Sequence, residues 1–556
     1  MGQCAVRSVA TQCNEPLIRP LVSLDRVVSL SSNRSITFAR YHSHERRLSD
    51  DYEVATEEVL GKGLNGDVIL AHGRADKKKY ALKTIRKKTS SSHRIKQLVA
   101  EVEIHLALDH PNIARLHDVY ESGTEIQLLT ECCDGGELYG ELNRRGVFNN
   151  ADAAEASRQM VRAVAYLHAH GVVHRDLKLE NFLFENDQAG AQLKLIDFGF
   201  AQYWNETSAP MQATCGSVAY ISPDVVNGQG YTNKCDVWSL GVVIWMLVAG
   251  YPPFHGDDNQ VVKKIQAAEM DWSYRCRWKD VCTEATDLIT VLLEKDPVRR
   301  PTAQAALQHP WLSQRDPSVE RESVALGRDS LRSMRKYADG PRLRRASLQL
   351  LAQESCPEDI KQVREEFLQV DRDDSGTLCF RELKDAIRGD QTSGNTRGSA
   401  SPQTPARALR QAPSISLEDV IRPMDSNGDE QIYFLDFVAA TMQSRSSNFE
   451  VAAHAAFRRL DPESAGTIDS HNFKRVLGET FEGIDIGELF KEVATPAAGK
   501  LDFEAFLLLL QGVDALQPPP PIPVSPKRGL PSRMDGKSND RRRVCFFPEE
   551  FTSAGA

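Results

Sequence analysis

Residues 174–181 read HRDLKLEN, and the tripeptide DFG follows from Asp197 after a short apolar run. Asp176 has the chemistry to accept a proton from a hydroxyl, and Lys178 can neutralise a phosphoryl group during its transfer. Asn181 and Asp197 carry oxygen ligands of the kind that Mg²⁺ prefers. The two motifs together indicate phosphoryl transfer.

Two further motifs lie upstream of these. Residues 60–68 read LGKGLNGDV, and the glycines let backbone N–H groups approach phosphate oxygens, although a plain glycine-rich hairpin would look the same. Lys83 ends the strand-like stretch YALK, where it can reach the α- and β-phosphates. Glu101 lies in the helical stretch 94–108 and can pair with Lys83. Chance does not account for four such motifs in this order and spacing.

With these motifs, residues 52–312 resemble the eukaryotic protein kinase family. The resemblance implies a two-lobed α+β fold that binds ATP in the cleft between the lobes. The small lobe is expected to be a five-stranded antiparallel sheet with one helix, which carries Glu101. The large lobe is expected to be mostly helical, with residues 236–241 (DVWSLG) in its central helix.

The same resemblance implies residue roles. Asp176 is the expected base, Lys178 its neighbour in catalysis, and Lys83 with Glu101 the ion pair required for activity. Asn181 and Asp197 are the expected Mg²⁺ ligands. The expected nucleotide-binding residues are Leu60, Gly61, Gly63, Gly66, Val68, Ala81, Lys83, Glu131, Cys133, Glu137, Leu183 and Ile196, with Thr130 as gatekeeper and Glu131 to Cys133 as the hinge that binds adenine.

Several positions depart from the family pattern. Asp224 stands where the family has Glu, and it is expected to pair with Arg300 on a shorter side chain. Ala213 occupies the position that is usually phosphorylated, and Thr214 is one place off register. We therefore expect activity that does not depend on phosphorylation there. Ser217 keeps a hydroxyl near the catalytic residues, which favours Ser/Thr over Tyr specificity.

Two acidic residues bear on the choice of substrate. Glu137 and Glu180 match positions that pair with a substrate arginine in basophilic kinases, and such pairs are directional. Protein substrates with Arg at the −3 position are therefore expected. The alternative is that Glu137 only binds the ATP ribose.

The composition suits a multidomain protein that buries sizeable cores. The chain has 556 residues, 41% of them hydrophobic and 26% charged, which is room for two to four domains. Residues 325–347 hold seven Lys/Arg against two Asp, and residues 357–512 hold 17 Lys/Arg against 27 Asp/Glu. This pattern predicts a partner within the chain and no nucleic-acid partner. The eleven cysteines form no C-x-x-C pair, which is typical of reduced thiols.

Residues 371–382 read DRDDSGTLCFRE and fit a twelve-residue EF-hand calcium loop. Gly376 allows the sharp turn, and Leu378 is expected to pair with a neighbouring loop. The predicted Ca²⁺ ligands are Asp371, Asp373, Ser375, Thr377 and Glu382.

Three further loops are degenerate. Residues 425–436 are expected to bind Ca²⁺ more weakly, because Glu430 replaces a glycine at a cost of roughly 1–2 kcal/mol and Asp436 is shorter than Glu. The predicted ligands of this loop are Asp425, Asn427, Asp429, Gln431 and Asp436. The loop 461–472 has Ala465 and Asn472 at two ligand positions and is expected to bind Ca²⁺ weakly or not at all. The loop 494–505 has no acidic residue at its first or last position and is expected to be a structural EF-hand without metal. Four EF-hands predict two paired lobes, as in calmodulin.

A kinase followed by a basic junction and four EF-hands resembles the calcium-dependent protein kinases of plants and alveolate protists. The resemblance implies a Ca²⁺-activated serine/threonine kinase that uses ATP, Mg²⁺ and Ca²⁺. The alternatives are a constitutively active kinase with structural EF-hands and a calcium-binding scaffold with a silent kinase domain. The expected parts are an N-terminal variable segment (1–51), a kinase domain (52–312), an autoinhibitory junction (313–357), a calmodulin-like domain (358–512) with a disordered insertion (389–415), and a disordered tail (513–556).

The junction sequence 331–351 is basic and amphipathic, so it is either a solvated face or a calmodulin-type target helix. As a target, it would cover the substrate groove at low Ca²⁺ and move to the EF-hand domain at high Ca²⁺. Gly340-Pro341 predicts a break into two helices. Arg344 at −3 to Ser347 makes that serine a predicted autophosphorylation site.

The N-terminus Met1-Gly2-Gln3-Cys4 resembles an N-myristoylation site with an adjacent cysteine for palmitoylation. The expectation is a cytoplasmic, monomeric protein that associates with membranes through acyl groups on Gly2 and Cys4. Val6 departs from the usual Ser/Thr, and the competing interpretation of the first 47 residues is an organelle transit peptide.

Overall fold

The computed structural model describes residues 40–43, 46–63, 66–74, 76–87, 92–213, 215–313, 326–355, 359–388, 417–425, 428–442, 449–493 and 499–512. The predictions on Gly2, Cys4, Thr214, Asn427, the insertion 389–415 and the tail 513–556 lie outside the described residues.

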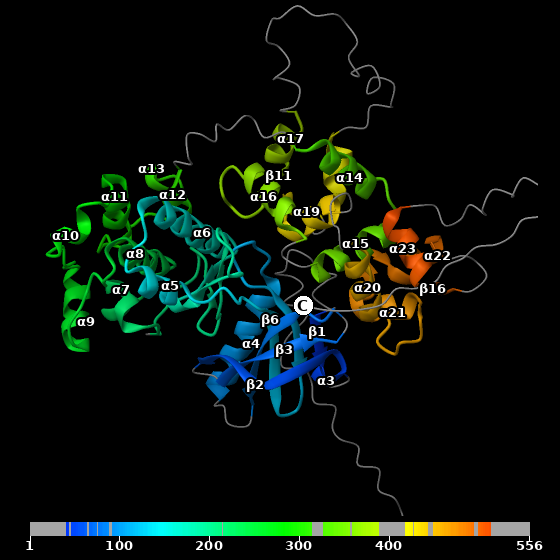
Figure 1. The fold of residues 1–556 in the computed structure, drawn as a ribbon, viewed down its shortest axis with the longest axis horizontal. Helices are drawn as coiled ribbons and strands as arrows, with labels where there is room; N and C mark the ends of the chain where they lie inside the picture. The colour runs from blue at the N-terminus through cyan, green and yellow to red at the C-terminus, as the bar shows by residue number, and fades with distance from the viewer. Residues whose placement is uncertain are drawn as a thin grey trace, which may run out of the picture. The chain divides into compact units, whose positions relative to one another are not determined.

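The small lobe is a six-stranded sheet in the order β1-β5-β6-β4-β3-β2, blue to teal in Figure 1. Its strands are β1 (Tyr41–Ser43), β2 (Tyr52–Gly63), β3 (Gly66–Gly73), β4 (Lys79–Arg86), β5 (Leu116–Glu121) and β6 (Glu125–Glu131). The short helix α3 (Leu48–Asp51) precedes β2, and α4 (Ser92–Ala107) carries Glu101, in the predicted helical stretch.

This sheet has one strand more than predicted. Strand β1 runs parallel to β5, so residues expected in an irregular N-terminal segment belong to the small lobe. Tyr41 is buried, and the guanidinium of Arg40 donates to the carbonyl oxygen of Leu106 at 2.9 Å. The expectation of five strands was wrong because a three-residue strand is too short to show a period-two pattern in the sequence.

The large lobe is mostly helical, as predicted. Its helices are α5 (Leu138–Arg145), α6 (Asn150–Ala169), α7 (Pro223–Val226), α8 (Lys234–Ala249), α9 (Asp258–Ala267), α10 (Arg275–Trp278), α11 (Thr283–Leu292), α12 (Ala303–Leu307) and α13 (Pro310–Ser313). Its short strands are β7 (Val172–Val173), β8 (Phe182–Phe184), β9 (Leu193–Leu195) and β10 (Gln202–Tyr203). Helix α8 is the buried central helix. A Cβ at Gly241 would lie 2.9 Å from the side chain of Leu293, so glycine permits this close approach.

The junction forms two helices, α14 (Arg328–Ala338) and α15 (Arg342–Glu354), and the predicted break at Gly340-Pro341 is confirmed. The EF-hand helices are α16 (Lys361–Val370), α17 (Phe380–Arg388), α18 (Leu417–Ile421), α19 (Phe434–Thr441), α20 (Phe449–Leu460), α21 (Ser470–Leu477), α22 (Ile486–Val493) and α23 (Phe503–Gln511). The short strands here are β11 (Leu378–Cys379), β12 (Gln431–Ile432), β13 (Thr467–Ile468), β14 (Thr480–Phe481), β15 (Ile484–Asp485) and β16 (Leu501–Asp502).

The EF-hand loops pair two by two. Leu378 lies opposite Ile432 in one antiparallel pair, and Ile468 lies opposite Leu501 in the other. Leu378 therefore does pair with a neighbouring loop, as its spacing predicted. Two EF-hands that share such a strand pair form one lobe, so the four units make two lobes.

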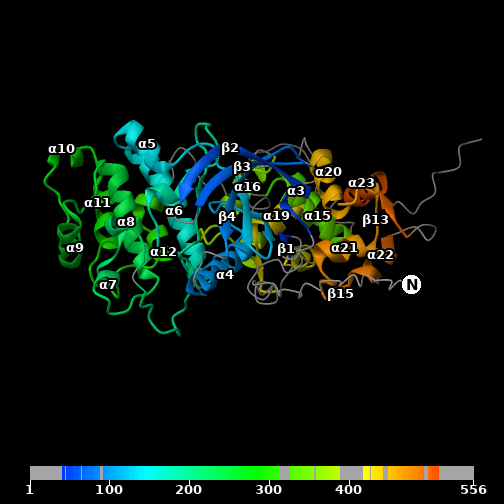
Figure 2. The ribbon, with the colours of Figure 1, turned by 90° about the horizontal axis from the view of Figure 1, so that it is seen from below.

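The junction helix α15 belongs to the core of the EF-hand lobes. It packs against α19, α20, α22 and α23, and Figures 1 and 2 both show it among these helices. Its residues from Leu343 to Glu354 are all buried, and one continuous apolar cluster joins its leucines to the phenylalanines of the EF-hands. A separate apolar cluster fills the large lobe of the kinase.

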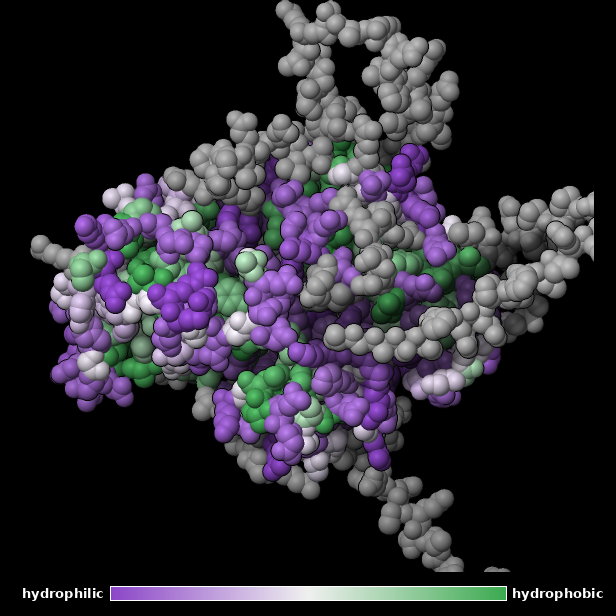
Figure 3. Space-filling model, viewed as in Figure 1, coloured by the Kyte–Doolittle hydropathy of each residue, from purple (hydrophilic) through white to green (hydrophobic). Residues whose placement is uncertain are grey.

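Hydrophilic residues cover most of the face drawn in Figure 3, with apolar residues gathered in smaller patches. None of the helices in the described part of the chain combines the length and the apolar composition that a membrane span needs.

The predicted pair of Asp224 and Arg300 forms. The Arg300 Nη2 lies 3.1 Å from Asp224 Oδ1, and its Nη1 donates to the Lys234 carbonyl oxygen at 2.7 Å. The Arg300 side chain is fully buried, while the neighbouring Arg299 side chain is 72% exposed.

We expect Arg300→Met to lower the free energy of unfolding by about 3–5 kcal/mol, because it leaves a buried carboxylate without its cation. The matched control Arg299→Met removes an exposed cation and should cost less than about 1 kcal/mol. Thermal and denaturant unfolding measure both variants, and equal losses would contradict the assignment of Asp224 and Arg300 as a stabilising pair.

Candidate functional site

Asp176 is held in one orientation by three donors. The backbone N–H and the hydroxyl of Ser217 both lie 3.0 Å from Asp176 Oδ1, and Lys178 Nζ lies 2.8 Å from Oδ2. Asn181 Nδ2 donates to the Asp176 backbone oxygen at 2.7 Å. The four predicted residues Asp176, Lys178, Asn181 and Ser217 therefore lie within one hydrogen-bonded group, which can orient a hydroxyl and a phosphoryl group.

Lys83 links the small lobe to Asp197 of the DFG motif. Its Nζ lies 2.7 Å from Glu101 Oε1 and 3.0 Å from Asp197 Oδ1, so the predicted ion pair is formed. Burial works to lower the pKa of Lys83, but the charges of Glu101 and Asp197 outweigh it and raise the pKa above its ordinary value. Burial likewise works to raise the pKa of Asp197, and Lys83 lowers it below the usual range. Both groups are charged at neutral pH.

The backbone at this site is strained. Asp197 has a φ of 58° and Arg175 a φ of 70°, a left-handed conformation that a non-glycine residue adopts only when its surroundings impose it. Asp236, at the start of α8, holds the second of these: its carboxylate accepts the N–H groups of His174 and Arg175, each at 2.8 Å. The sequence placed Asp236 in the central helix but gave no sign of this positioning role.

The predicted nucleotide-binding residues lie on adjacent strands. Gly61 and Gly63 are on β2, Gly63 lies opposite Gly66, and Val68 lies opposite Lys83. The structure places the remaining ones as follows: Leu60 on β2, Ala81 on β4 opposite Thr130 on β6, Glu131 at the end of β6, Cys133 between β6 and α5, Glu137 before α5 and bridged to Leu183 on β8, and Ile196 directly after β9. Together they line the two sides of the interlobe region.

The negative charges of Glu137 and Glu180 are close enough to repel each other. Burial raises the pKa of Glu137, and the charge of Glu180 adds to this shift. Within the described chain, no group donates a hydrogen bond to the buried Oε2 of Glu180. A pair of carboxylates in such a setting is a suitable receptor for a guanidinium group.

The first calcium loop gathers its carboxylates. One oxygen from each of Asp371, Asp373 and Glu382 lies within 4.8 Å of the others, the only such cluster among the described residues. Asp371 accepts the N–H groups of Ser375 and Gly376, each at 2.9 Å, and the Ser375 hydroxyl donates to the Thr377 carbonyl oxygen at 3.0 Å. Burial raises the pKa of Asp371 and the nearby carboxylates add to it. These residues fit a divalent cation, which would neutralise the crowded charges.

The second loop makes contacts within the protein with two of its predicted ligands. Glu430 takes the positive φ of 64° expected at the glycine position. The buried Asp436, however, accepts a hydrogen bond at 2.9 Å from Gln349 Nε2 of the junction helix, and Asp429 accepts one from the Tyr433 hydroxyl. Asp425, Asp429 and Asp436 form no carboxylate cluster among the described residues. The contact with Gln349 competes with metal binding by Asp436, whose predicted role as a ligand is tested below.

The third loop also uses its side chains for structure. Asn472, at the last ligand position, accepts the N–H of Asp469 at 2.8 Å, and Asp469 caps α21 in return. Part of the fourth loop, residues 494–498, lies outside the described residues.

The first calcium loop also contacts the large lobe of the kinase. Asp374, between two predicted ligands, forms an ion pair with Arg162 on α6, and both side chains are buried. A Cβ at Gly376 would lie 2.2 Å from the ring of His110. In the next loop, the backbone N–H of Leu435 donates to the carboxylate of Asp109 at 2.8 Å. No pattern in the sequence predicted these contacts.

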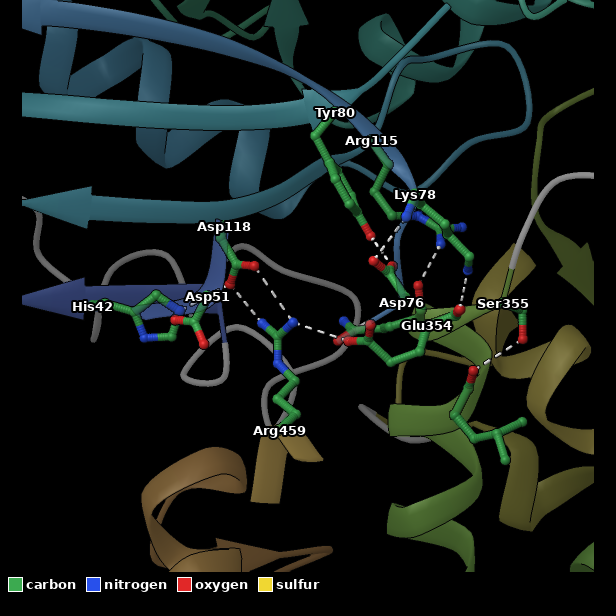
Figure 4. A network of polar contacts seen from close by, with 12 residues as sticks. His42, Asp51, Asp76, Lys78, Tyr80, Arg115, Asp118, Glu354, Ser355 and Arg459 are labelled. Carbon is green, nitrogen blue, oxygen red and sulfur yellow. Dashed lines mark hydrogen bonds and ion pairs between the residues drawn. The ribbon is translucent and has the colours of Figure 1, made fainter. Parts of the chain in front are cut away.

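The second half of the EF-hand domain contacts the small lobe through the network in Figure 4. Arg459, on α20, lies 2.6 Å from Asp118 on β5 and 2.9 Å from Glu354 at the end of the junction. His42 of the added strand β1 lies 2.8 Å from the same Asp118. Lys78 Nζ donates to the Glu354 carbonyl oxygen at 2.5 Å, where a cation complements the C-terminus of α15.

The junction arginines lie in the EF-hand domain. Arg344 donates to the Leu510 carbonyl oxygen at 3.1 Å, and Arg345 pairs with Glu482 at 2.5 Å. Ser347, the predicted autophosphorylation site, is fully buried and donates to the Leu343 carbonyl oxygen at 2.8 Å. A kinase cannot reach Ser347 in this arrangement.

Comparisons with known proteins agree on both halves of the chain. Residues 54–312 match the family model described as protein kinase domain. The chain is 30% identical over 478 residues to calcium-dependent protein kinase 9 of Oryza sativa subsp. japonica, covering 84% of this chain and 78% of the relative. It is 31% identical over 480 residues to calcium-dependent protein kinase 22 of Arabidopsis thaliana, with 83% and 90% covered. Calcium-dependent protein kinase 3 of Plasmodium berghei is 29% identical over 471 residues, with 83% and 80% covered.

The geometry predicts that the first loop and not Asp436 binds Ca²⁺. Asp371→Asn removes one of three clustered carboxylates and should weaken the tightest Ca²⁺ site by more than about tenfold. Asp436→Asn keeps an acceptor for Gln349 and should leave both the number of bound ions and the tightest affinity unchanged. Isothermal titration calorimetry measures both, and the loss of one bound ion in Asp436→Asn would restore Asp436 as a ligand.

Proposed function

The chain belongs to the calcium-dependent protein kinase family, and we propose that its own EF-hand domain activates it by holding the junction helices away from the substrate groove. It is a Ca²⁺-regulated serine/threonine protein kinase that uses ATP and Mg²⁺. The observation that carries the proposal is the burial of α15, from Leu343 to Glu354, in the core of the EF-hand lobes.

The catalytic steps are assigned to residues of the site. Asp176, fixed by Ser217 and Lys178, orients the substrate hydroxyl and accepts its proton, and Lys178 stabilises charge on the transferring phosphoryl group. Lys83, fixed by Glu101, positions the nucleotide phosphates. Asn181 and Asp197 would hold Mg²⁺, which supplies further neutralisation of phosphate charge.

Autoinhibition is assigned to the arginines of the junction. Glu137 and Glu180 offer two carboxylates to a substrate arginine, and a junction arginine can compete for the same place. In the arrangement described above, Arg344 and Arg345 have partners in the EF-hand domain instead. The junction therefore has two alternative binding sites, the substrate groove and the EF-hand domain. The substrate groove is open when the junction is bound to the EF-hand domain.

The energy required is within reach of calcium binding. Moving a 1:99 equilibrium to 99:1 needs about 5.5 kcal/mol of differential binding. An EF-hand supplies the part of its binding free energy by which it binds Ca²⁺ more tightly when the junction is docked on the EF-hand domain than when it covers the groove. Docking of α15 into an exposed apolar groove adds the burial of its leucines.

The proposals that concern the N-terminus rest on sequence alone. Acylation of Gly2 and Cys4, with the membrane association that follows from it, stays a prediction, since both residues lie outside the described part of the chain. The same holds for the role of Thr214.

A Ca²⁺ titration of peptide phosphorylation tests the proposed function. The wild type should gain activity over about 10⁻⁷–10⁻⁵ M free Ca²⁺, and Asp371→Ala should need much higher concentrations. Equal activity in chelator and in Ca²⁺ would instead identify a constitutively active kinase with structural EF-hands. Asp176→Asn should abolish turnover, and unchanged turnover in that variant would remove the assigned base.

The substrate preference has its own test. Glu137→Gln and Glu180→Gln should each raise KM about 10- to 100-fold for a peptide with Arg at −3, because a charge-assisted hydrogen bond contributes about 1.5–3 kcal/mol. KM for the matching Ala peptide should hardly change. Glu141→Gln is the control, since Arg144 and Arg145 already hold that carboxylate on the same helix. An equal rise in KM for ATP with no peptide discrimination would favour ribose binding by Glu137.

A further inference from the structure

We propose that Arg364, on the first helix of the EF-hand domain, positions the adenine-binding hinge of the kinase through a chain of buried charged side chains. Arg364 Nη1 lies 2.7 Å from Glu185 Oε1, and the same oxygen lies 3.3 Å from Lys194 Nζ. Lys194 Nζ lies 2.9 Å from Glu131 Oε1. Glu131 ends strand β6 and begins the hinge. The inference rests on the proposed function, since it assumes a hinge and a regulatory domain that docks.

All four side chains of this series of ion pairs are largely buried. The side chains of Arg364, Glu185, Lys194 and Glu131 are 7%, 5%, 7% and 12% exposed. Their charges alternate in sign and cancel only when all four are present. Without Arg364, the kinase would bury two carboxylates with one ammonium between them, an arrangement that is costly in a medium of low dielectric constant.

The charges affect one another as this arrangement requires. Burial works to raise the pKa of Glu185, but Lys194 and then Arg364 lower it below its ordinary value. Burial works to lower the pKa of Lys194, and Glu131 with Glu185 raises it instead. Lys194 therefore pairs with two carboxylates: Glu185, which also pairs with Arg364, and Glu131, which belongs to the hinge.

The hinge end of the chain is fixed on two sides. Glu131 donates its backbone N–H to the Arg115 carbonyl oxygen at 2.8 Å and accepts the Arg115 N–H on its side chain at 3.2 Å. The Arg115 guanidinium reaches the Gln353 carbonyl oxygen, in the last turn of α15, at 3.5 Å. The hinge is thus linked to the EF-hand domain through Lys194 and Glu185, and to the junction helix through Arg115.

The direction of the effect follows from the shared lysine. When the EF-hand domain leaves, Glu185 loses Arg364 and draws more strongly on Lys194, which weakens the contact between Lys194 and Glu131. Glu131 and the adjoining hinge backbone then lose a restraint. Docking of the EF-hand domain should therefore raise the affinity for ATP in addition to opening the substrate groove.

The position of Arg364 on its helix supports a dedicated contact. Val363 and Phe367, on the same helix, are buried in the apolar core of the EF-hand lobe. Lys361, one turn earlier, is exposed. Arg364 is thus the cation of α16 that the kinase buries, and Lys361 is a matched control of the same charge.

The test uses the full-length protein at saturating Ca²⁺ and saturating peptide. Arg364→Met should raise KM for ATP about tenfold with kcat changed less than about twofold, as expected for loss of one charge-assisted contact that acts on binding. Arg364→Lys should recover part of the loss, and Lys361→Met should behave as the wild type. In a Glu185→Gln background, Arg364→Met should add little, because the chain is already interrupted.

A second readout does not depend on turnover. The affinity for ADP, measured by calorimetry, should rise on addition of Ca²⁺ in the wild type and in Lys361→Met. In Arg364→Met this affinity should not respond to Ca²⁺. If Arg364→Met is too unstable to assay, Arg364→Lys should show a smaller rise in KM for ATP than that expected of Arg364→Met, and a smaller response of ADP binding to Ca²⁺ than the wild type. Wild-type values of both would overturn the positioning role.

The outcomes separate this inference from the proposed function. A wild-type KM for ATP in Arg364→Met, or a fall in kcat at constant KM, overturns the positioning role while Ca²⁺ activation of the wild type stands. A wild type that shows no Ca²⁺ dependence overturns the proposed function itself, whatever Arg364 does.

Discussion

A charge buried between two domains must meet its opposite there, and this constraint governs how the EF-hand domain contacts the kinase. Arg162 meets Asp374 and Arg364 meets Glu185, while Arg459 lies between two carboxylates. The pairs Arg162–Asp374, Arg364–Glu185 and Arg459–Asp118 each take one partner from the kinase and one from the regulatory half, and Glu354 adds a second carboxylate from the junction. Because a partial contact would leave some of these charges unpaired and desolvated, the contact is expected to form as a whole.

The same constraint explains how calcium binding in the EF-hand domain can affect the kinase active site. Asp374 lies in the twelve-residue loop that gathers Asp371, Asp373 and Glu382. A cation that orders this loop therefore also orders the residue that pairs with Arg162 on α6. Of the other pairs, one involves Glu185, which follows β8 in the large lobe, and one involves Asp118 on β5, so the docked domain touches both lobes of the kinase. Binding free energy at the loop is thereby coupled to the relative placement of the lobes.

The sequence predicted those features that depend on local pattern. The motifs around Asp176 and Lys83 have fixed spacing, and the structure brings their side chains together. The break at Gly340-Pro341 and the pairing of Leu378 with a neighbouring loop follow from local chemistry in the same way. The contact between Arg364 and Glu185 could not be predicted, because it joins residues 179 positions apart and nothing near either one marks its partner.

Two of the degenerate loops use a predicted ligand position for a contact within the fold. Asp436, at a ligand position, holds Gln349 of the junction, and Asn472, at the same position of the third loop, caps a helix. A side chain engaged in such a contact supports the fold of its EF-hand without an ion. The ion-dependent part of the switch is then concentrated in the first loop. If the first loop is the site that Ca²⁺ fills, the response to Ca²⁺ can be no steeper than a simple one-site binding curve, since steeper curves require several coupled sites.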